Sequence, residues 1–308
     1  MLVALFLLRG PVDAQSTVTQ PYQGITYTES STSTPRPIRM HVVQVDLLAP
    51  GIRFTLTPPG GSRETERHTT TEFVTAQRAQ VGINGHFFLP FPSTDTSAWL
   101  IGLAASEGRV YSSCETPEQN YALVADAPTI NIDRANRASV VHCDSSGTDR
   151  TRIREQVELW TAISGSAQIV TDGVVTIPQY RDATHPDAAL TPGSARNYAN
   201  GNSWYDVVTA RSAIGLSRDG KTLTLFTVDA RGGSDGMKVG EVASVLIDTY
   251  GVWNALNIDG GGSTSLALAD PVTGVVSLVN TSSDNPAGRS VGSSLAVFAA
   301  KQTSSVGR

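Results

Sequence analysis

The sequence predicts an α+β fold: a single domain rich in mixed β-sheet with a few helices packed on it. Hydrophobic residues make up 40% of the 308 residues and charged residues 17%, with 28 Gly and 16 Pro. Such a chain can bury a core and still form many turns. Most apolar runs are short, β-branched and bounded by turn residues, which is typical of strands. Helical spacing is rarer, so sheet dominates the prediction.

The N-terminal residues 1–14 are interpreted as a signal peptide. An apolar run at 2–8 precedes small residues that suit cleavage after Ala14. A frayed apolar N-terminus is the alternative. No stretch reaches the roughly 18 apolar residues that a membrane-spanning helix needs. We therefore expect a secreted or extracytoplasmic protein that does not span a membrane.

After the signal peptide the chain divides by composition. Residues 15–37 are rich in Ser, Thr and Pro and are expected to form an extended or mobile entry segment. No clear linker interrupts residues 38–300, which we assign to one domain. The last residues, 301–308, are expected to be a disordered tail.

Within the domain, β-branched runs and turn residues locate the strands, and apolar spacing locates the helices. Turn 218–220 separates two apolar runs and predicts a hairpin. Gly251 follows the second helical segment as a candidate C-cap. The expected strands are 40–48, 81–83, 121–124, 129–132, 162–170, 213–216, 221–228 and 255–258, and the expected helices are 70–80 and 239–250.

The net charge is −5, and Lys and Arg form no run. Nucleic-acid binders depend on clustered positive charge, so a nucleic-acid partner is not expected. A negatively charged substrate would have to be bound by individual arginines.

Two cysteines, Cys114 and Cys143, are the only ones in the chain. In an exported protein two cysteines most simply form one disulfide. The alternative is a catalytic Cys–His pair, because His142 precedes Cys143.

The segment 81–88 runs from an apolar strand into Asn84, which is flanked by glycines. An Asn there can present its amide while the neighbouring backbone approaches a ligand closely. The alternative is a turn whose Asn adopts a left-handed conformation. His86 is interpreted as a packed histidine rather than a base.

The segment 257–264 is more specific. Asp259 stands at a strand exit, where it could be a general acid/base or a metal ligand. No side chains shield the backbone N–H groups of the consecutive glycines that follow it, and such N–H groups can form an anion-binding nest. A flexible linker is the alternative interpretation of the glycines. Ser and Thr hydroxyls complete the expected anion site, which comprises Gly260, Gly261, Gly262, Ser263 and Thr264.

Three further residues are candidates. Arg211 and Arg289 are isolated arginines in non-basic surroundings, and guanidinium groups bind phosphate oxygens through paired hydrogen bonds. Surface salt bridges are the alternative for both. Asp229 follows an apolar run, so it is a second strand-exit carboxylate or a turn residue.

In this order, the segments resemble the phosphodiester glycosidase family over residues 41–298. The run Asn-Ile-Asp-Gly-Gly-Gly-Ser-Thr is its most specific part. His86 and Ala230 depart from the family pattern, and residues 114–160 match nothing recognisable. The matching segments are 82–88, 211–215, Asp229, 241–243, 255–264, and Arg289 with Val291.

The resemblance implies an enzyme that hydrolyses the glycosidic C–O bond of a sugar-1-phosphodiester, carried by a glycan or a cell-envelope polymer. Free sugar and a phosphomonoester would be released. Asp259 would act as base or electrostatic stabiliser near C1, with Asp229 as its acid/base partner or a cation ligand. Arg211, Arg289 and the glycine run would hold the phosphate, and Asn84 a sugar hydroxyl.

Two other functions remain open at this stage. One is a non-catalytic sugar-phosphate-binding protein of the envelope, and the other is a phosphodiesterase that cuts the P–O bond. The 5 histidines show no paired spacing for two metals, yet a divalent cation is not excluded. No cofactor is assigned, the oligomeric state is open, and Asn280 begins a glycosylation sequon.

Overall fold

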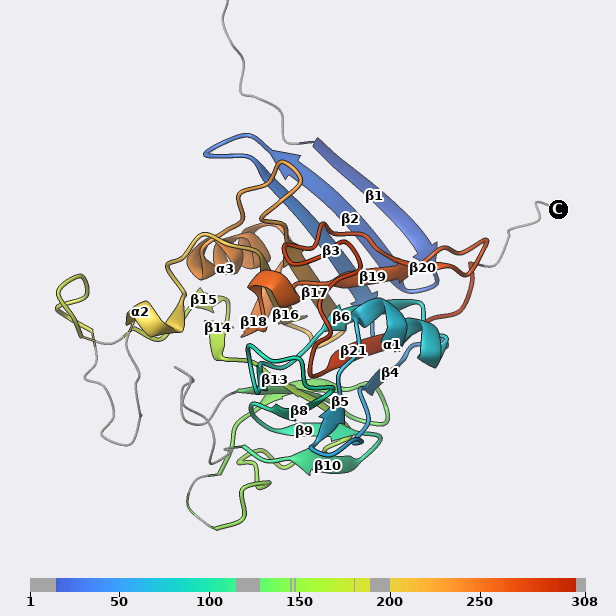
Figure 1. Cartoon of the computed structure of the whole chain (residues 1–308), viewed down its shortest axis with the longest axis horizontal. Coiled ribbons are helices and arrows are strands. Elements are labelled where there is room, and N and C mark those ends of the chain that lie inside the picture. Colours follow the sequence, from blue (N-terminus) through green and yellow to red (C-terminus); the bar gives the residue numbers. More distant parts are fainter. Residues whose placement is uncertain are drawn as a thin grey trace, which may run out of the picture.

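The computed structural model describes residues 15–114, 128–144, 146, 148–179, 181–188 and 200–302. These residues form one large sheet and three smaller ones, with few helices (Figure 1). The expected sheet-rich domain with few helices is confirmed. The expectation of mixed sheet is wrong, because all strand pairs among the described residues are antiparallel.

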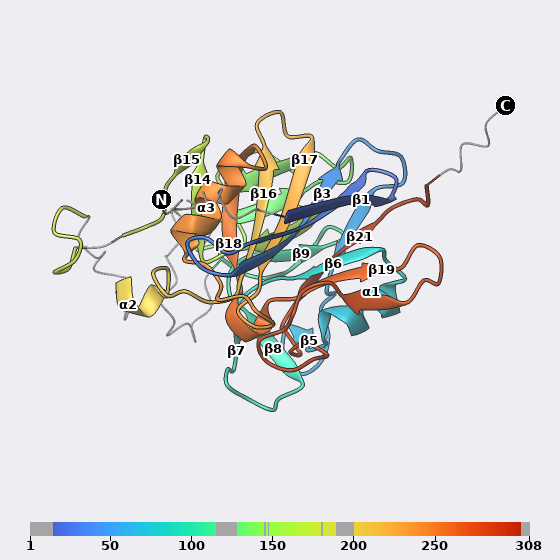
Figure 2. The same ribbon diagram turned by 90° about the horizontal axis from the view of Figure 1, so that it is seen from above.

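The large sheet has eight strands, and Figure 2 shows its central members side by side. Helix α3 (Val239–Asp248) packs on it through Val242 and Leu246, which join a cluster with Phe226. In spatial order the strands are β1 (Gln15–Tyr22), β2 (Ile25–Thr32), β3 (Ile38–Asp46), β17 (Thr222–Val228), β16 (Arg211–Ser217), β18 (Val252–Ile258), β14 (Ala167–Thr171) and β15 (Val174–Val175).

A five-stranded sheet carries helix α1 (Thr70–Gln77) on its outer side, where Phe73 and Val74 meet Ala267 and Ala296. Its strands in order are β20 (Val276–Leu278), β19 (Leu266–Ala269), β6 (Val81–Asn84), β21 (Ser294–Phe298) and β4 (Arg53–Leu56).

The two remaining sheets have five and three strands. A five-stranded sheet consists of β10 (Arg109–Ser112), β9 (Ala104–Ser106), β13 (Thr161–Ser164), β11 (Thr129–Ile132) and β12 (Ala138–Val141). A three-stranded sheet consists of β5 (Thr65–Glu66), β8 (Ser97–Leu100) and β7 (Phe88–Leu89). The short helices are α2 (Asn200–Ser203) and the 3₁₀ turn η1 (Gly261–Ser263).

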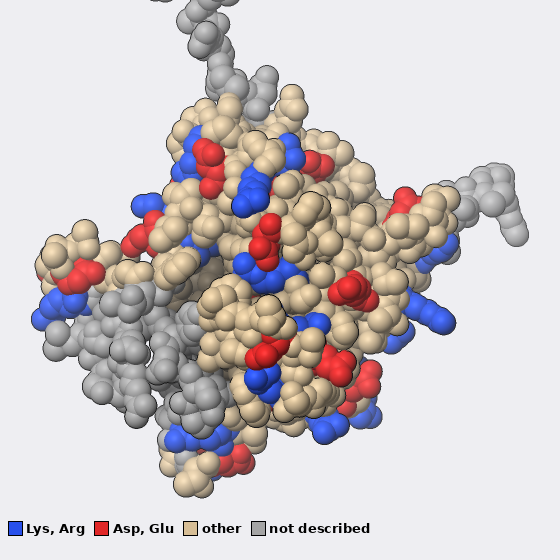
Figure 3. All heavy atoms as spheres, in the orientation of Figure 1, with Lys and Arg blue, Asp and Glu red and all other residues tan. Residues whose placement is uncertain are grey.

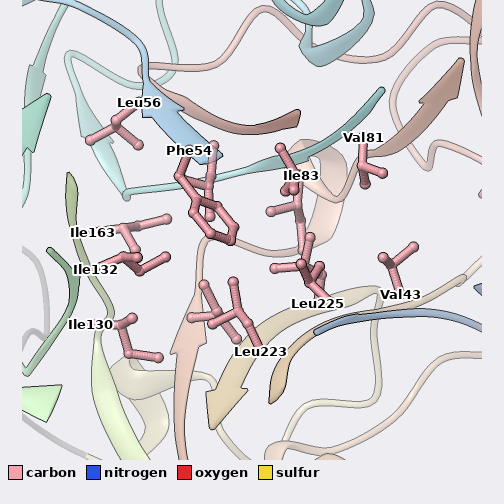
Figure 4. Close-up of a cluster of buried hydrophobic side chains, with 14 of the residues drawn as sticks. Val43, Phe54, Leu56, Val81, Ile83, Ile130, Ile132, Ile163, Leu223 and Leu225 are labelled. Carbon is pink, nitrogen blue, oxygen red and sulfur yellow. The ribbon is translucent and has the colours of Figure 1, made fainter. Parts of the chain in front are cut away.

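The main core lies where the sheets face one another (Figure 4). Leu225 of the large sheet, Ile83 of β6 and Ile163 of β13 are fully buried there. Each fully buried aliphatic side chain contributes about 1.5–3 kcal/mol. This shared core fixes the sheets relative to one another, and so it fixes the loops at their ends.

Both expected helices are present. Thr69 caps α1 with a capping box formed with Glu72, and the left-handed Arg78 (φ 55°) ends it. The expected strands in the described residues are also present, with one correction. Residues 162–170 form two strands in different sheets, because Gly165 lets the chain pass the Asn257 backbone where a Cβ would lie 2.5 Å from its carbonyl oxygen.

The segment 15–37 is extended rather than mobile. Strands β1 and β2 form a hairpin that continues the large sheet beyond β3, and buried Tyr22 donates its hydroxyl to the Ala269 carbonyl at 3.0 Å. Lys301 pairs with Tyr22, so this residue is not part of the expected disordered tail. The expected signal peptide, the strand 121–124 and residues 303–308 lie outside the described residues.

The Cys114–Cys143 disulfide is present, so the alternative of a Cys–His nucleophile pair is wrong. It joins two residues 29 positions apart in the chain and lies beside buried Leu103. A disulfide fits an oxidising compartment. Of the helices in the described part of the chain, none is long and apolar enough to cross a membrane.

Candidate active site

Three predicted residues meet at one end of the large sheet. In β16, Arg211 pairs with Val228 of β17, and Ser212 pairs with Ile258 of β18. Asp229 and Asp259 therefore leave the sheet on either side of the start of β16. Neighbouring strands lie about 4.8 Å apart, so the two backbones are roughly 10 Å apart.

Asp259 is partly exposed and lies at the exit of β18. Burial raises the pKa of its carboxyl group to about 7, although hydrogen bonds from Ser263 and from the Gly260 backbone, together with the charge of Arg289, oppose the shift. The group can therefore gain or lose a proton near neutral pH, as a general acid or base must.

Arg289 reaches the same place from a distant loop. Its Nη1 donates to Ser263 Oγ at 3.2 Å, and its Nε donates to Asp284 Oδ2 at 2.9 Å. A Cβ at Gly262 would lie 2.2 Å from the guanidinium group, so only glycine permits this approach. Asp259, Ser263 and Arg289 thus form one connected group, which we call the Asp259 group.

The molecule shows no broad basic patch on the face that Figure 3 draws. On the face that Figure 3 shows, basic and acidic side chains are interspersed. An anion at the site would therefore be held by individual side chains such as Arg289, whose side chain is 21% exposed.

The glycine run forms a compact turn instead of an open nest. Gly261 donates its N–H to the Ala210 carbonyl at 2.8 Å, and Ser263 and Thr264 donate theirs to Gly260 and Gly261. Ser263 and Thr264 are fully buried. The N–H groups of Gly261, Ser263 and Thr264 therefore donate to backbone carbonyls rather than to a ligand, whereas an anion-binding role of Gly260 and Gly262 stays a prediction. The turn instead brings the Ser263 hydroxyl to the Asp259 carboxyl group.

Asn84 is fully buried and holds the turn in place. Its Nδ2 donates to the Asp259 carbonyl at 2.6 Å, and its Oδ1 accepts from Ser212 Oγ at 2.8 Å and from the Ser265 N–H at 3.0 Å. These hydrogen bonds occupy the amide, so the expectation that it binds a sugar hydroxyl is not supported. Asn84 positions Asp259 instead.

The side-chain N–H groups of Arg211 also donate hydrogen bonds within the protein. Its Nε donates to the Met237 carbonyl at 3.1 Å and its Nη2 to the carbonyls of Trp204 and Val207. Burial lowers its pKa to about 10, so it stays protonated at neutral pH. Its Cα lies close to Gly260, which follows Asp259, whereas its Nη2 donors point into the 204–207 loop.

Asp229 is fully buried, unlike Asp259. Its Oδ1 accepts from the Thr281 N–H at 3.0 Å, and its Oδ2 lies 3.4 Å from His41 Nε2. His41 Nδ1 in turn lies 2.8 Å from the Tyr27 hydroxyl. Next to Thr281, the Asn280 Nδ2 donates to the Thr264 carbonyl at 3.2 Å. Asp229 therefore supports the glycine turn through the 280–281 segment.

His86 is fully buried, with its Nδ1 2.8 Å from Ser293 Oγ, and burial lowers its pKa to about 4. It is the packed histidine that the sequence predicted. Among the described residues, no group of three or more His, Cys, Asp and Glu could hold a metal ion. Two surface cavities, of about 420 and 650 Å³, have linings that do not include the Asp259 group.

Several residues of the site were missed in the sequence. Asp284 pairs with Arg289 across a turn, and opposite charges flanking Asn-Pro-Ala-Gly could have indicated it. Phe91 places its ring 4.6 Å from the Arg289 guanidinium carbon. His41 lies inside an apolar strand, and nothing in its sequence context marks it.

The family model described as phosphodiester glycosidase matches residues 77–298. The N-acetylglucosamine-1-phosphodiester alpha-N-acetylglucosaminidase of Homo sapiens is 28% identical over 210 residues, which are 68% of this chain and 36% of that protein. The Bos taurus protein of the same name is 27% identical over 237 residues, 77% of this chain and 38% of that protein. The chain thus spans little more than a third of the length of these relatives.

Solved structures share the fold. The catalytic domain of the zebrafish protein of that name, auto-inhibited by its pro-peptide, matches with a TM-score of 0.60 at 21% identity, over 95% of this chain and 85% of that chain. A Burkholderia pseudomallei protein matches with a TM-score of 0.62 at 15% identity, over 93% of this chain and 96% of that chain.

Proposed function

Because this chain belongs to the phosphodiester glycosidase family, we propose that it hydrolyses the glycosidic C–O bond of a sugar-1-phosphodiester. The products would be the free sugar and a phosphomonoester. The names of the curated relatives support this reaction class. The substrate we propose is a glycosyl phosphodiester of a glycan or a cell-envelope polymer.

The observation that carries the proposal is the Asp259 group. A carboxyl group with a pKa of about 7 lies beside the Ser263 hydroxyl and the Arg289 guanidinium. Cleavage at C1 develops positive charge on the sugar and negative charge on the leaving phosphate. A carboxylate next to a guanidinium group supplies the complementary charges for both.

In the mechanism we propose, water attacks C1 and Asp259 in its ionised form takes one of its protons. The electron pair of the C1–O bond leaves with the phosphomonoester. That leaving group is already anionic, so it needs charge stabilisation more than protonation. Arg289 would supply this charge, because its guanidinium is partly exposed and tied to Ser263.

The other predicted residues act indirectly in this proposal. Asn84 and Arg211 hold the Asp259 backbone and the adjoining loop, and Asp229 holds the 280–281 segment. None of the three needs to touch the substrate. A secreted or extracytoplasmic location is part of the proposal, because the disulfide fits an oxidising compartment.

Product analysis tests the proposal. Purified protein would be incubated with a panel of sugar-1-phosphodiesters, and free reducing sugar, sugar phosphate and phosphomonoester would be measured. We expect free sugar and phosphomonoester in equal amounts. Sugar phosphate with a free alcohol would mean P–O cleavage, and binding without turnover would mean a sugar-phosphate-binding protein; either result overturns the proposal.

A further inference from the structure

A loop between β7 and β8 brings an exposed aromatic residue to the Asp259 group. Phe91 is 38% exposed and stands between two prolines, whose fixed φ angles restrict the loop. Its ring meets the Phe88 ring edge-on, with the centroids 5.9 Å apart. Phe88 itself is buried and packs against Gly292. The loop is thereby anchored on the segment that follows Arg289.

The guanidinium carbon of Arg289 lies over the face of the Phe91 ring, 4.6 Å from the ring centroid. The same guanidinium donates hydrogen bonds to Asp284 and Ser263. Phe91 therefore adds a contact from a separate loop to a group that these two hydrogen bonds already hold.

The hydrogen bonds alone hold Arg289 weakly. Asp284 is a surface residue whose side chain is 40% exposed, and an exposed ion pair stabilises an ordered side chain little. An arginine side chain also loses rotamer entropy when it is ordered, and the contacts that hold it must offset this loss. An aromatic face beside a guanidinium contributes a comparable amount when it is partly desolvated.

The backbone that follows Arg289 is fixed independently. Arg67 Nη2 donates to the Ser290 carbonyl at 3.0 Å, and Val291 donates its N–H to the His68 carbonyl at 2.9 Å. Because the backbone is already held, the contact with Phe91 acts on the side chain of Arg289 alone.

We propose that Phe91 is a positioning residue that holds the Arg289 guanidinium against Ser263, where it binds the phosphate of the substrate. The inference rests on the proposed function for its substrate, but the geometry that it invokes belongs to the free protein. It assigns a role in phosphodiester binding to a loop outside the large sheet.

Two substitutions test the role. Phe91→Leu keeps an apolar side chain but removes the aromatic face, whereas Phe91→Tyr keeps the face. Trp99→Ala is the matched control, because Trp99 is 37% exposed on the neighbouring strand β8. All would be made in the full chain and compared by kcat and KM on the best phosphodiester found for the wild type.

We expect Phe91→Leu to raise KM about two- to thirtyfold with a smaller change in kcat, as the loss of one such contact implies. Phe91→Tyr and Trp99→Ala should remain near wild type. Equal effects of Leu and Tyr, or an effect of Leu no larger than that of the control, would overturn the proposal.

A second readout does not depend on activity. The Arg289 charge lowers the pKa of Asp259, so a guanidinium released from its place should let that pKa rise. Titration of the Asp259 carboxyl carbon by NMR should move upward in Phe91→Leu and stay in place in Phe91→Tyr. An unchanged titration in Phe91→Leu contradicts the positioning role, even if the wild type hydrolyses no phosphodiester and the proposed function fails.

Discussion

Asp229 and Asp259 each follow a strand of the large sheet, but their surroundings differ. Asp259 follows β18, is partly exposed, and has a pKa raised to about 7. Asp229 follows β17, is fully buried, and is bonded to Thr281 and His41. A strand-exit carboxylate can therefore serve chemistry or hold a loop, and its neighbours decide which.

The physical difference between the two aspartates lies in the groups that surround their carboxyl oxygens. Asp229 accepts a backbone N–H and faces a histidine, so both of its carboxyl oxygens have partners inside the protein. Asp259 has Ser263, the Gly260 N–H and Arg289 near it, yet these only partly offset the effect of burial on its pKa. The Asp259 carboxyl group can therefore change its protonation near neutral pH.

The largest expected effect is on turnover. Asp259→Asn keeps the shape of the side chain but removes the base, so we expect kcat/KM on a sugar-1-phosphodiester to fall at least about 10²–10³-fold. Asp248→Asn, an exposed change at the end of α3, is the control. Near wild-type turnover of a folded Asp259→Asn protein would remove Asp259 from the mechanism.

The second prediction concerns Asp229. Asp229→Ala leaves the Thr281 N–H and His41 without their buried partner, and we expect the free energy of unfolding to fall by about 2–3 kcal/mol. Asp229→Asn can still accept from Thr281 and should lose less stability. Chemical denaturation measures both.

The activity of the Asp229 variants tests whether Asp229 takes part in the chemistry as Asp259 does. If Asp229 only supports the glycine turn, folded Asp229→Asn should lose less than about tenfold in kcat/KM, well below the loss for a catalytic group. A loss as large as that of Asp259→Asn would show that both carboxylates take part in the chemistry.

The third prediction is that Asp259 lowers the stability of the fold at neutral pH. Its pKa is about 7 in the folded chain and about 3.9 in an unfolded one. The folded state therefore binds the extra proton, and the penalty for ionising the group grows from about pH 4 to pH 7. Asp259→Asn should raise stability by about 2 kcal/mol at pH 8, after allowance for its partial exposure, and by nothing at pH 4.

Thermal unfolding at the two pH values measures this difference. Asp248→Asn, an exposed substitution at the end of α3, is the control. Equal stabilisation by Asp259→Asn at both pH values would mean that the Asp259 carboxyl group is not desolvated.

The smallest expected effect is a shift in the pH profile. Activity should rise with pH through an apparent pKa near 7, since the ionised form of Asp259 is the base. Ser263→Ala removes a hydrogen bond that lowers this pKa, so the rising limb should move to higher pH by up to about one unit. A rise in activity that shifts to lower pH in Ser263→Ala, or a wild-type activity that decreases with increasing pH around pH 7, would contradict the assignment of Asp259 as base.

Much of the fold was predictable because local patterns carry it. The hairpin of β16 and β17, helix α3 and the capping box of α1 follow from turn residues, apolar spacing and a Thr–Glu pair. The break between β13 and β14 was not predictable. It depends on Gly165 passing the Asn257 backbone, which lies far away in sequence.

The sequence predicted which residues belong to the candidate site better than it predicted what each of them does. The sequence identified Asp259, Ser263 and Arg289, and the structure joins them. It also predicted ligand contacts for Asn84 and Arg211, whose donors point to backbone carbonyls. The sequence does not show where the N–H groups of a side chain point. Their hydrogen-bond partners therefore cannot be assigned until the chain is folded.

By itself, the sequence predicted a disulfide-bonded, sheet-rich domain with a glycine run after a strand-exit aspartate, because composition, strand patterns and glycines act locally. Only the tertiary structure decided which carboxyl group lies next to a guanidinium group and which is bonded to a backbone N–H and a histidine. Desolvation and charge pairing depend on atoms that distant segments bring together, such as Arg289 and Phe91 beside Asp259. That is why two similar aspartates acquire different chemistry.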